Sequence, residues 1–323
     1  MLLDNFSRKF QYIRLSITES CNFKCQYCLP NGYKKTCTDS SLSLNEINNL
    51  IAALVEMGVW KIRLTGGEPT TRGDLTEIIK IIKAYPEIKQ LALTTNGYKL
   101  AHNVAEYYEA GLTNLNVSID SFDREQFKAI TQVDKLDYIM NSIEMARSIG
   151  VAKIKINAVL LTHTINELHL FLRYIKNRPL SIRFIELMQT SDNGAYFKAN
   201  YVSADILKNE LLNNGWKEMA RESGAGPAVE FSHPNYLGRV GIIAPYSKDF
   251  CTTCNRLRFT HLGDLRLCLF GDGNYPLRNL LQSSNQKDEL KHAILEALTA
   301  KPKEHLLHSF KFGNIQNLSN VGG

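Results

Sequence analysis

Short apolar segments and amphipathic segments alternate through the first two thirds of the chain. The short apolar runs predict strands, and apolar residues at three- and four-residue spacing predict helices. The predicted strands are 12–17, 60–65, 90–97, 114–120, 153–159 and 181–188, and the predicted helices are 44–57, 75–84, 101–110, 124–130, 136–149 and 166–176. Strands connected by helices in this way run parallel, either in an open doubly wound sheet or in a barrel.

Polar residues and glycines gather at the carboxyl end of each predicted strand. Gly66-Gly67-Glu68 follows the second strand, and Thr94-Thr95-Asn96 ends the third. Barrels of β/α units place their ligand site at this end of the strands. Because six units fall short of the eight in a full barrel, we expect an α/β fold with an incomplete (β/α)6 TIM-like barrel and an open side.

The pattern changes near Gly215. The remaining chain holds a short apolar segment at 239–245 and two predicted helices at 277–281 and 288–298. We therefore expect two domains, a barrel over residues 1–217 and a C-terminal domain over residues 218–323 that caps the open side of the barrel.

Three cysteines, Cys21, Cys25 and Cys28, lie directly after the first predicted strand. Thiolates clustered like this on a loop can converge on one inorganic centre. Zinc would require a fourth protein ligand, and the first histidine in the chain is His102. Since a catalytic metal site keeps one position open, we expect an iron–sulfur cluster with one iron free for an exogenous ligand.

A second set of three cysteines follows in the last third of the chain: Cys251, Cys254 and Cys268. A closed zinc site would need a further ligand such as His261, and zinc stays open as an alternative for this set. Arg256 and Arg258 alternate, so in an extended segment both would point to one face. Two guanidinium groups beside a metal centre suit a polyphosphate, because each grips phosphate oxygens at two points.

Charged residues interrupt several of the apolar strands: Arg14, Lys61, Arg63, Lys155 and Arg183. Charges that face a barrel interior are costly unless an anion pairs with them. Salt-bridge partners alone do not explain five such cations on different strands. We therefore expect an anionic ligand, and the modest formal net charge of +6 agrees with one without requiring it.

The composition is that of a globular protein, with 44% hydrophobic and 22% charged residues. No apolar run approaches the roughly 20 residues of a membrane span, and residues 1–10 do not form a secretory signal. We expect a cytoplasmic protein without a membrane or nucleic-acid partner. In that compartment the seven cysteines are metal ligands more often than disulfides.

The run from Cys21 to Cys28, with Tyr27 before the last cysteine, resembles the signature of the radical S-adenosylmethionine superfamily. The resemblance implies that the three cysteines hold a [4Fe–4S] cluster whose fourth iron binds S-adenosylmethionine. Reduction then yields a 5′-deoxyadenosyl radical, while the protein supplies position and excludes water. In Gly66-Gly67-Glu68-Pro69, glycine lets the backbone approach a ligand, and the Glu68 carboxylate can accept from an amino group.

The chain further resembles the branch of this superfamily that cyclises GTP in molybdenum cofactor biosynthesis. The resemblance rests on the second cysteine set, on Asn255–Arg258, on Gly226-Pro227-Ala228 and on the terminal Gly322-Gly323. It implies a second [4Fe–4S] cluster that binds GTP at the guanine. The implied radical takes hydrogen from C3′ of GTP, and C3′ then bonds to C8 to give (8S)-3′,8-cyclo-7,8-dihydro-GTP.

The resemblance also implies residue roles. S-adenosylmethionine would contact Tyr27, Gly67, Ser118 and Met188. GTP would contact Arg14, Arg63, Thr94, Lys155, Arg256, Leu257 and Arg258, with Lys61 and Arg183 in addition. The catalytic residues would be Arg256, Arg258, Gly322 and Gly323. The family usually carries a basic residue where this chain has Gly73, and we expect from this a local loop change without loss of activity.

The implied partners are GTP, a cyclic pyranopterin monophosphate synthase that acts on the product, and an electron donor such as flavodoxin or ferredoxin. A homodimer is compatible with the family. Two other functions stay open. A peptide-maturing radical enzyme would more often carry extra C-terminal cysteines, and a zinc-stabilised nucleic-acid-binding protein would need a basic face.

Overall fold

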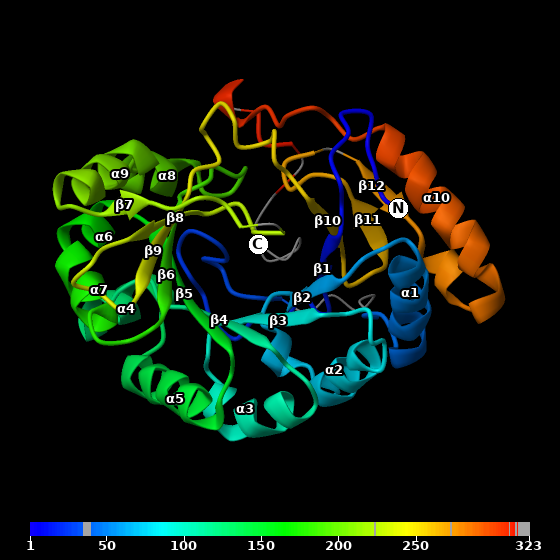
Figure 1. Cartoon of the computed structure of the whole chain (residues 1–323), viewed down its shortest axis with the longest axis horizontal. Helices are drawn as coiled ribbons and strands as arrows, with labels where there is room; N and C mark the ends of the chain where they lie inside the picture. Colours follow the sequence, from blue (N-terminus) through cyan, green and yellow to red (C-terminus); the bar gives the residue numbers. More distant parts are fainter. Residues whose placement is uncertain (35–39, 223, 272, 310, 314, 316–323) are drawn as a thin grey trace.

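The computed structural model describes residues 1–34, 40–222, 224–271, 273–309, 311–313 and 315 (Figure 1). Within these residues, twelve strands form one sheet in the order β12-β11-β10-β1-β2-β3-β4-β5-β6-β9-β8-β7. The run from β10 to β9 is parallel. Its strands are β1 (Tyr12–Ser16), β2 (Lys61–Thr65), β3 (Gln90–Thr95), β4 (Asn114–Ser118), β5 (Lys153–Leu160), β6 (Ser181–Glu186), β9 (Arg239–Ile243) and β10 (Arg256–Phe259).

Antiparallel strands end the sheet on both sides. β11 (Asp264–Arg266) and β12 (Asn274–Pro276) follow β10, whereas β8 (Val229–Ser232) and β7 (Lys217–Glu218) follow β9. The sheet curls around a central space, and its two edges do not pair with each other among the described residues (Figure 1). This architecture confirms the incomplete TIM-like barrel.

Helices cover the outside of the curled sheet (Figure 1). They are α1 (Leu44–Glu56), α2 (Leu75–Lys83), α3 (Leu100–Glu109), α4 (Arg124–Thr131), α5 (Leu136–Ile149), α6 (Thr162–Asn166), α7 (Leu168–Ile175), α8 (Gly194–Asn200), α9 (Ala204–Asn213) and α10 (Lys287–Thr299). α6 and α7 replace the single helix predicted at 166–176, and the helix predicted at 277–281 is a short 3-10 helix, η2 (Arg278–Leu281). Of the described helices, none has the length and apolar character to cross a membrane.

The last third of the chain joins the sheet itself in addition to covering the open side. β10 pairs in parallel with β1, so that Arg258 lies beside Arg14. β9 pairs in parallel with β6 at the other end of the run. The segment that carries the second cysteine set is thereby brought next to the strand that leads into the first.

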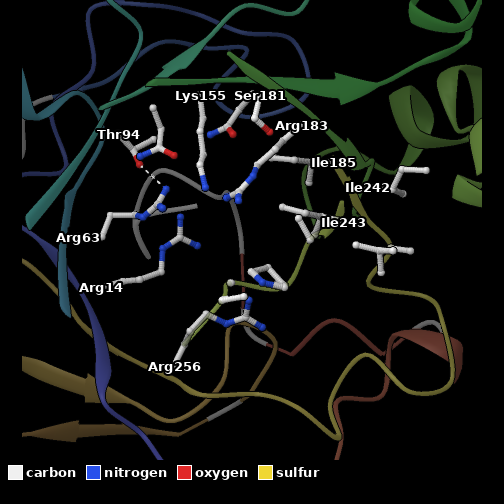
Figure 2. A pocket seen from close by; sticks show the side chains of 18 of the residues that line it. Arg14, Arg63, Thr94, Lys155, Ser181, Arg183, Ile185, Ile242, Ile243 and Arg256 are labelled. Atoms are coloured by element: carbon white, nitrogen blue, oxygen red, sulfur yellow. Dashed lines mark hydrogen bonds between the residues drawn. The ribbon is translucent and has the colours of Figure 1, made fainter. Parts of the chain in front are cut away.

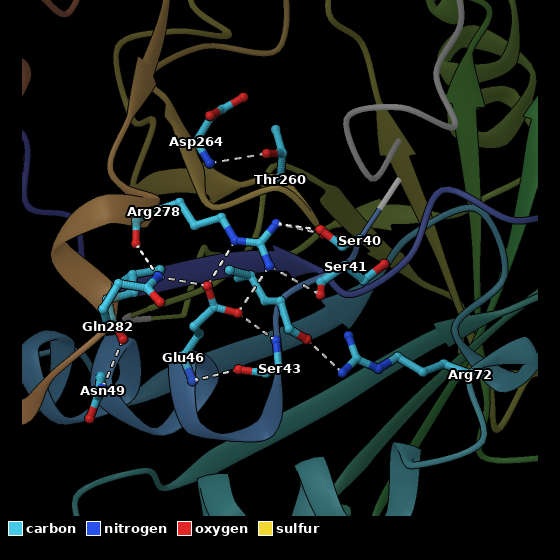
Figure 3. A network of polar contacts seen from close by, with 12 residues as sticks. Ser40, Ser41, Ser43, Glu46, Asn49, Arg72, Thr260, Asp264, Arg278 and Gln282 are labelled. Carbon is cyan, nitrogen blue, oxygen red and sulfur yellow. Dashed lines mark hydrogen bonds and ion pairs between the residues drawn. The ribbon is translucent and has the colours of Figure 1, made fainter. Parts of the chain in front are cut away.

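A polar network fastens the C-terminal third to α1 (Figure 3). Ser43 and Glu46 form the capping box at the start of α1. The same Glu46 carboxylate accepts from Arg278 at 2.8 and 3.1 Å and from Gln282 at 2.9 Å. Burial alone would raise the pKa of Glu46, but the hydrogen bonds from Arg278, Ser43 and Gln282 outweigh it and lower the pKa to about 2. An ionised Glu46 therefore holds both parts of the chain together.

Candidate active site

A cavity of about 1150 Å³ occupies the interior of the barrel. Alternate residues of the parallel strands line it, because every second side chain points inward, and loops at the carboxyl ends of the strands complete it. Pockets for a single small ligand usually measure about 300–1,000 Å³. The cavity is therefore large enough for more than one ligand.

The first cysteine set lies on the loop after β1, and all three thiols line the cavity. Gly67 explains how the loop after β2 can lie directly against the loop that carries the first cysteine set. Its amide donates to the Thr18 carbonyl at 2.8 Å, and a Cβ on Gly67 would collide with the backbone oxygens of Glu19 and Ser20. Only glycine fits this approach between the two loops.

The thiols of the first set are held in an environment that disfavours free thiolates. Burial raises the pKa of Cys21 to about 11, and Glu68 adds to the rise. Burial also raises the pKa of Cys25 well above its usual value, with further contributions from Asp120, Cys28 and Cys21. These mutual effects show that the three thiols are neighbours. Cationic iron would offset the burial, since metal binding displaces thiol protons.

The side-chain geometry suits a cluster better than a single zinc ion. Within the described residues, no three His, Cys, Asp or Glu side chains converge as ligands of one metal ion. In a [4Fe–4S] cluster each thiolate binds a different iron, so the sulfurs need not meet at one atom. Two sets of three cysteines on one cavity therefore fit two such clusters.

The residues expected around S-adenosylmethionine also line the cavity: Tyr27, Gly67, Ser118 and Met188. The Tyr27 hydroxyl donates to Asp120 at 2.8 Å. Burial raises the pKa of Asp120 to about 6, although the hydrogen bonds from Val159 and Tyr27 act against the rise. This pair holds the loop that carries Cys28 against the end of β4.

Hydrogen bonds from three neighbouring residues position the Glu68 carboxylate. Its carboxylate accepts from the Thr70 amide and hydroxyl at 3.0 and 2.6 Å, from the Thr95 hydroxyl at 2.7 Å and from the Asn96 amide at 2.6 Å. The side chain is 1% exposed. Three of these donors share Oε1 and one reaches Oε2, and Glu68 lines the cavity, so the expectation that it accepts from an amino group of a ligand stays a prediction.

The second cysteine set lies on the loops before β10 and after β11 and lines the same cavity. Burial raises the pKa of Cys251. Burial alone would do the same for Cys254, but the positive charges of Arg256 and Lys301 outweigh it and lower the pKa to about 7. His261, the candidate fourth zinc ligand, instead lies 3.8 Å from Glu19.

Seven of the cations that line the cavity are called the cationic belt below: Arg14, Lys61, Arg63, Lys155, Arg183, Arg256 and Arg258. Figure 2 shows several of them pointing toward the same space from different strands, with Ile185, Ile242 and Ile243 on another side. Arg258, Arg14 and Arg63 are register partners on three adjacent strands. The alternation of charge along these strands therefore places the cations on one inner face.

Partial or complete burial makes the cationic belt electrostatically unfavourable. Burial lowers the pKa of Lys155 to about 7, with a further contribution from Arg183. Burial and the neighbouring Arg256 lower the pKa of Arg258 to about 10. Arg183 is compensated by Glu230, whose Oε1 lies 2.7 Å from Nη2. A ligand with several negative charges would favour the protonated form of every member.

Almost every residue singled out from the sequence borders the cavity. Leu257 differs, because its side chain is fully buried in the core on the opposite face of β10. Gly322 and Gly323 lie outside the described residues. A Cβ added at Gly73 would have no neighbour within 4 Å. This agrees with the expectation that the departure from the family at this position changes the loop only locally.

The cavity residues that the sequence alone does not single out include Tyr12, Glu230 and Lys301. Tyr12 alternates with Arg14 on β1, and this spacing could have revealed it. No local pattern marks Glu230 or Lys301, because each reaches the cavity from the last third of the chain through the tertiary fold.

Two family models match consecutive parts of the chain. The model of the Radical SAM superfamily matches residues 15–175. The model named Molybdenum Cofactor Synthesis C matches residues 180–307. The first range holds one cysteine set, and the second range holds the other.

Solved structures with similar folds include Streptococcus suis SuiB bound to S-adenosylmethionine. It has a TM-score of 0.63 and 12% identity, over 89% of this chain and 68% of that one. SuiB bound to the precursor peptide SuiA has a TM-score of 0.61 and 13% identity, over 95% and 68%. At such identities the likeness concerns the fold alone, and it does not favour a peptide substrate.

Proteins found by sequence are far more similar to this chain than these solved structures are. A protein of Pectobacterium atrosepticum named GTP 3′,8-cyclase is 48% identical over 325 residues, covering 100% of this chain and 99% of that protein. Proteins of the same name from Yersinia pestis and Photorhabdus laumondii are each 49% identical at the same coverage. By this full-length identity, the chain belongs to the GTP 3′,8-cyclase family of the radical S-adenosylmethionine superfamily.

Proposed function

We propose that this chain is a radical S-adenosylmethionine lyase that converts GTP to (8S)-3′,8-cyclo-7,8-dihydro-GTP, the first step of molybdenum cofactor biosynthesis. The observation that carries the proposal is the meeting of two cysteine sets and the cationic belt in one cavity of about 1150 Å³. A cofactor and a polyanionic substrate can both be held there. The activity of the full-length relatives points to the same reaction.

The first cysteine set serves the cofactor in this proposal. When bound, a [4Fe–4S] cluster with S-adenosylmethionine supplies a 5′-deoxyadenosyl radical after one-electron reduction. Cys21, Cys25 and Cys28 hold the cluster, and residues 1–217 form the domain around it. Tyr27, Gly67, Ser118 and Met188 then surround S-adenosylmethionine at the carboxyl ends of the strands, where they keep water from the reacting atoms.

The second cysteine set and the cationic belt serve GTP. Cys251, Cys254 and Cys268 hold the other [4Fe–4S] cluster at the guanine end, within a domain formed by residues 218–323. The cationic belt binds the triphosphate. Arg63 is oriented by the hydrogen bond of 3.1 Å that it donates to the Thr94 hydroxyl. Fixing both ends of GTP would orient the ribose and the guanine relative to each other, which the bond between C3′ and C8 requires.

Five of the residues that the resemblance implies have narrower roles here. Leu257 contributes through its backbone, since its side chain is buried in the core. Arg256 and Arg258 act on the reacting nucleotide, beside the second cluster. Gly322 and Gly323 are proposed to support catalysis, as the resemblance implies.

The reaction requires partners of defined chemistry. A cyclic pyranopterin monophosphate synthase would consume the product, and flavodoxin or ferredoxin would deliver the electron. Because reduced clusters with an open iron require a reducing compartment, we place the enzyme in the cytoplasm. The family also permits a homodimer.

Anaerobic reconstitution tests the proposal. Two clusters predict about eight irons per chain, and Cys251→Ser should lower the count to about four. Reduced wild-type protein with S-adenosylmethionine should release 5′-deoxyadenosine and the cyclised nucleotide when GTP is added, but not when a peptide is added. Four irons in the wild type, unchanged in Cys251→Ser, would refute the proposal. So would turnover that does not depend on GTP.

A further inference from the structure

Tyr12 is a cavity residue to which the proposed function assigns no role. It is the first residue of β1 and lies two positions before Arg14, so both side chains share the inward face. Its register partners are Lys61 on β2 and Arg256 on β10. The side chain is only 4% exposed. Tyr12 therefore lies among members of the cationic belt on three adjacent strands.

The Tyr12 ring is close to two of these cations. Lys61 Nζ lies 4.8 Å from the ring centroid, and Arg63 Cζ lies 5.8 Å from it. The face of an aromatic ring carries negative partial charge and attracts a cation within about 6 Å. Such a ring can hold a cation in place without taking up its N–H donors as a carboxylate would. Lys61 donates to the Gly224 carbonyl at 3.2 Å and Arg63 to the Thr94 hydroxyl at 3.1 Å, and each keeps further N–H donors for a phosphate.

Arg183 provides the contrast within the same belt. Its guanidinium donates two hydrogen bonds to Glu230 Oε1, at 3.2 and 2.7 Å. This carboxylate both neutralises Arg183 and occupies its donors. The ring of Tyr12 offsets the positive charges of Lys61 and Arg63 more weakly than Glu230 offsets the charge of Arg183. A triphosphate can therefore replace the ring as their partner more easily than it can replace Glu230.

The phenolic hydroxyl lies in the same positive field. Burial alone would raise the pKa of Tyr12, but the charges of Arg63, Arg14, Lys61 and Arg256 outweigh it and lower the pKa to about 8. A phosphate that enters this field brings negative charge and favours the neutral phenol. In the complex, the O–H group is therefore present and can donate to a phosphate oxygen.

We propose that Tyr12 binds the triphosphate of GTP, with its ring positioning Lys61 and Arg63 and its hydroxyl donating a hydrogen bond to a phosphate oxygen. This inference rests on the proposed function, because it takes GTP as the substrate. It divides the contribution of Tyr12 into two parts. Tyr12→Phe removes the donor alone, whereas Tyr12→Leu removes the ring as well.

Anaerobic calorimetry on the reconstituted enzyme tests both parts with two ligands, GTP and guanosine. We expect Tyr12→Phe to weaken GTP binding about fivefold and Tyr12→Leu about fiftyfold. Guanosine affinity should not change, since guanosine has no phosphate. In turnover, KM for GTP should rise while kcat at saturating GTP stays close to the wild-type value. Tyr107→Phe is the matched control, because Tyr107 on α3 is also 4% exposed but does not line the cavity.

The outcomes separate this inference from the proposed function. GTP affinity that is equal in the wild type and both variants would overturn the role of Tyr12. Equal losses for GTP and guanosine would also overturn it, because they would indicate general damage to the site. If Tyr12→Leu does not fold, the Tyr12→Phe measurement decides. A wild type that does not bind GTP at all would instead refute the proposed function.

Discussion

The two cysteine sets share a ligand type but lie in opposite electrostatic surroundings. Near the first set, Glu68 and Asp120 add to the effect of burial and raise the thiol pKa values. Near the second set, Arg256 and Lys301 oppose burial and bring the pKa of Cys254 down to about 7. One cavity thus has an acidic end and a basic end.

This polarity matches the charges of the two ligands. S-adenosylmethionine carries a sulfonium cation, and GTP carries a triphosphate. Residues that favour a cation surround the first set, whereas the cationic belt adjoins the second. We infer that charge directs each ligand to its own end of the cavity, in addition to the selection made by the open iron of each cluster.

The largest expected effect is a separation of the two ends by cysteine substitution. Cys25→Ser should abolish 5′-deoxyadenosine formation while GTP binding remains, because only the first cluster is lost. Cys254→Ser should abolish tight GTP binding while S-adenosylmethionine is still cleaved without productive coupling. Iron analysis, nucleoside chromatography and anaerobic calorimetry measure these outcomes. Loss of both activities in both variants would contradict the division of labour between the ends.

The basic end can be weakened by itself. We expect Arg256→Ala to reduce the free energy of GTP binding by about 1–3 kcal/mol through the loss of a charged hydrogen bond. S-adenosylmethionine affinity should not change. Arg124→Ala on α4 is the control, since it removes the same charge from an exposed ion pair with Asp134. A matching loss in the control would mean that net charge, and not the position of Arg256, determines binding.

The basic end should also respond to pH. The pKa of Lys155 is lowered to about 7, chiefly by burial, and a bound phosphate would favour the protonated amine and raise that pKa. GTP binding should therefore take up a proton above about pH 7 and weaken as pH rises, by up to about tenfold per pH unit.

Calorimetry at pH 8 in buffers of different ionisation enthalpy measures this proton uptake. Lys155→Arg is the matched variant, because arginine keeps the charge and remains protonated across this range. We expect it to reduce the uptake without removing GTP binding, because Tyr12, with a pKa of about 8, accounts for the remainder. Equal proton uptake in the wild type and Lys155→Arg would assign the proton to another group.

Local patterns predict most of the barrel and both cysteine sets. The periods of strands and helices are visible in short windows, and Cys21, Cys25 and Cys28 lie within eight residues of one another. The inward direction of Arg14 and Arg63 also follows from the two-residue period of a strand. These features depend on neighbours in the sequence, so the sequence alone is sufficient to predict them.

Long-range pairing accounts for what the sequence does not predict. Nothing near residues 239–245 or 256–259 indicates that these segments extend the barrel sheet beside β6 and β1. Glu230 enters the cavity because β8 pairs with β9, and Lys301 enters it from the segment after α10. The position of Glu68 after β2 is visible in the sequence, whereas its hydrogen bonds from Thr95 on β3 and from Asn96 after β3 are not. The roles of residues whose partners are distant in the sequence can be read only from the three-dimensional structure.

The smallest expected effect on ligand binding concerns the polar network that fastens the C-terminal third of the chain to α1. Because the pKa of Glu46 falls from its usual 4.5 to about 2 in the folded protein, its contribution to stability is complete above pH 4.5 and is lost as pH falls toward 2. Glu46→Gln should therefore lower the free energy of unfolding by about 1–3 kcal/mol at pH 7. This difference should shrink in acid, as measured by denaturant unfolding across pH.

GTP and S-adenosylmethionine affinities should remain unchanged at pH 7, since Glu46 lies on α1, outside the cavity. A variant with wild-type stability would show that α1 and η2 are held together by packing alone.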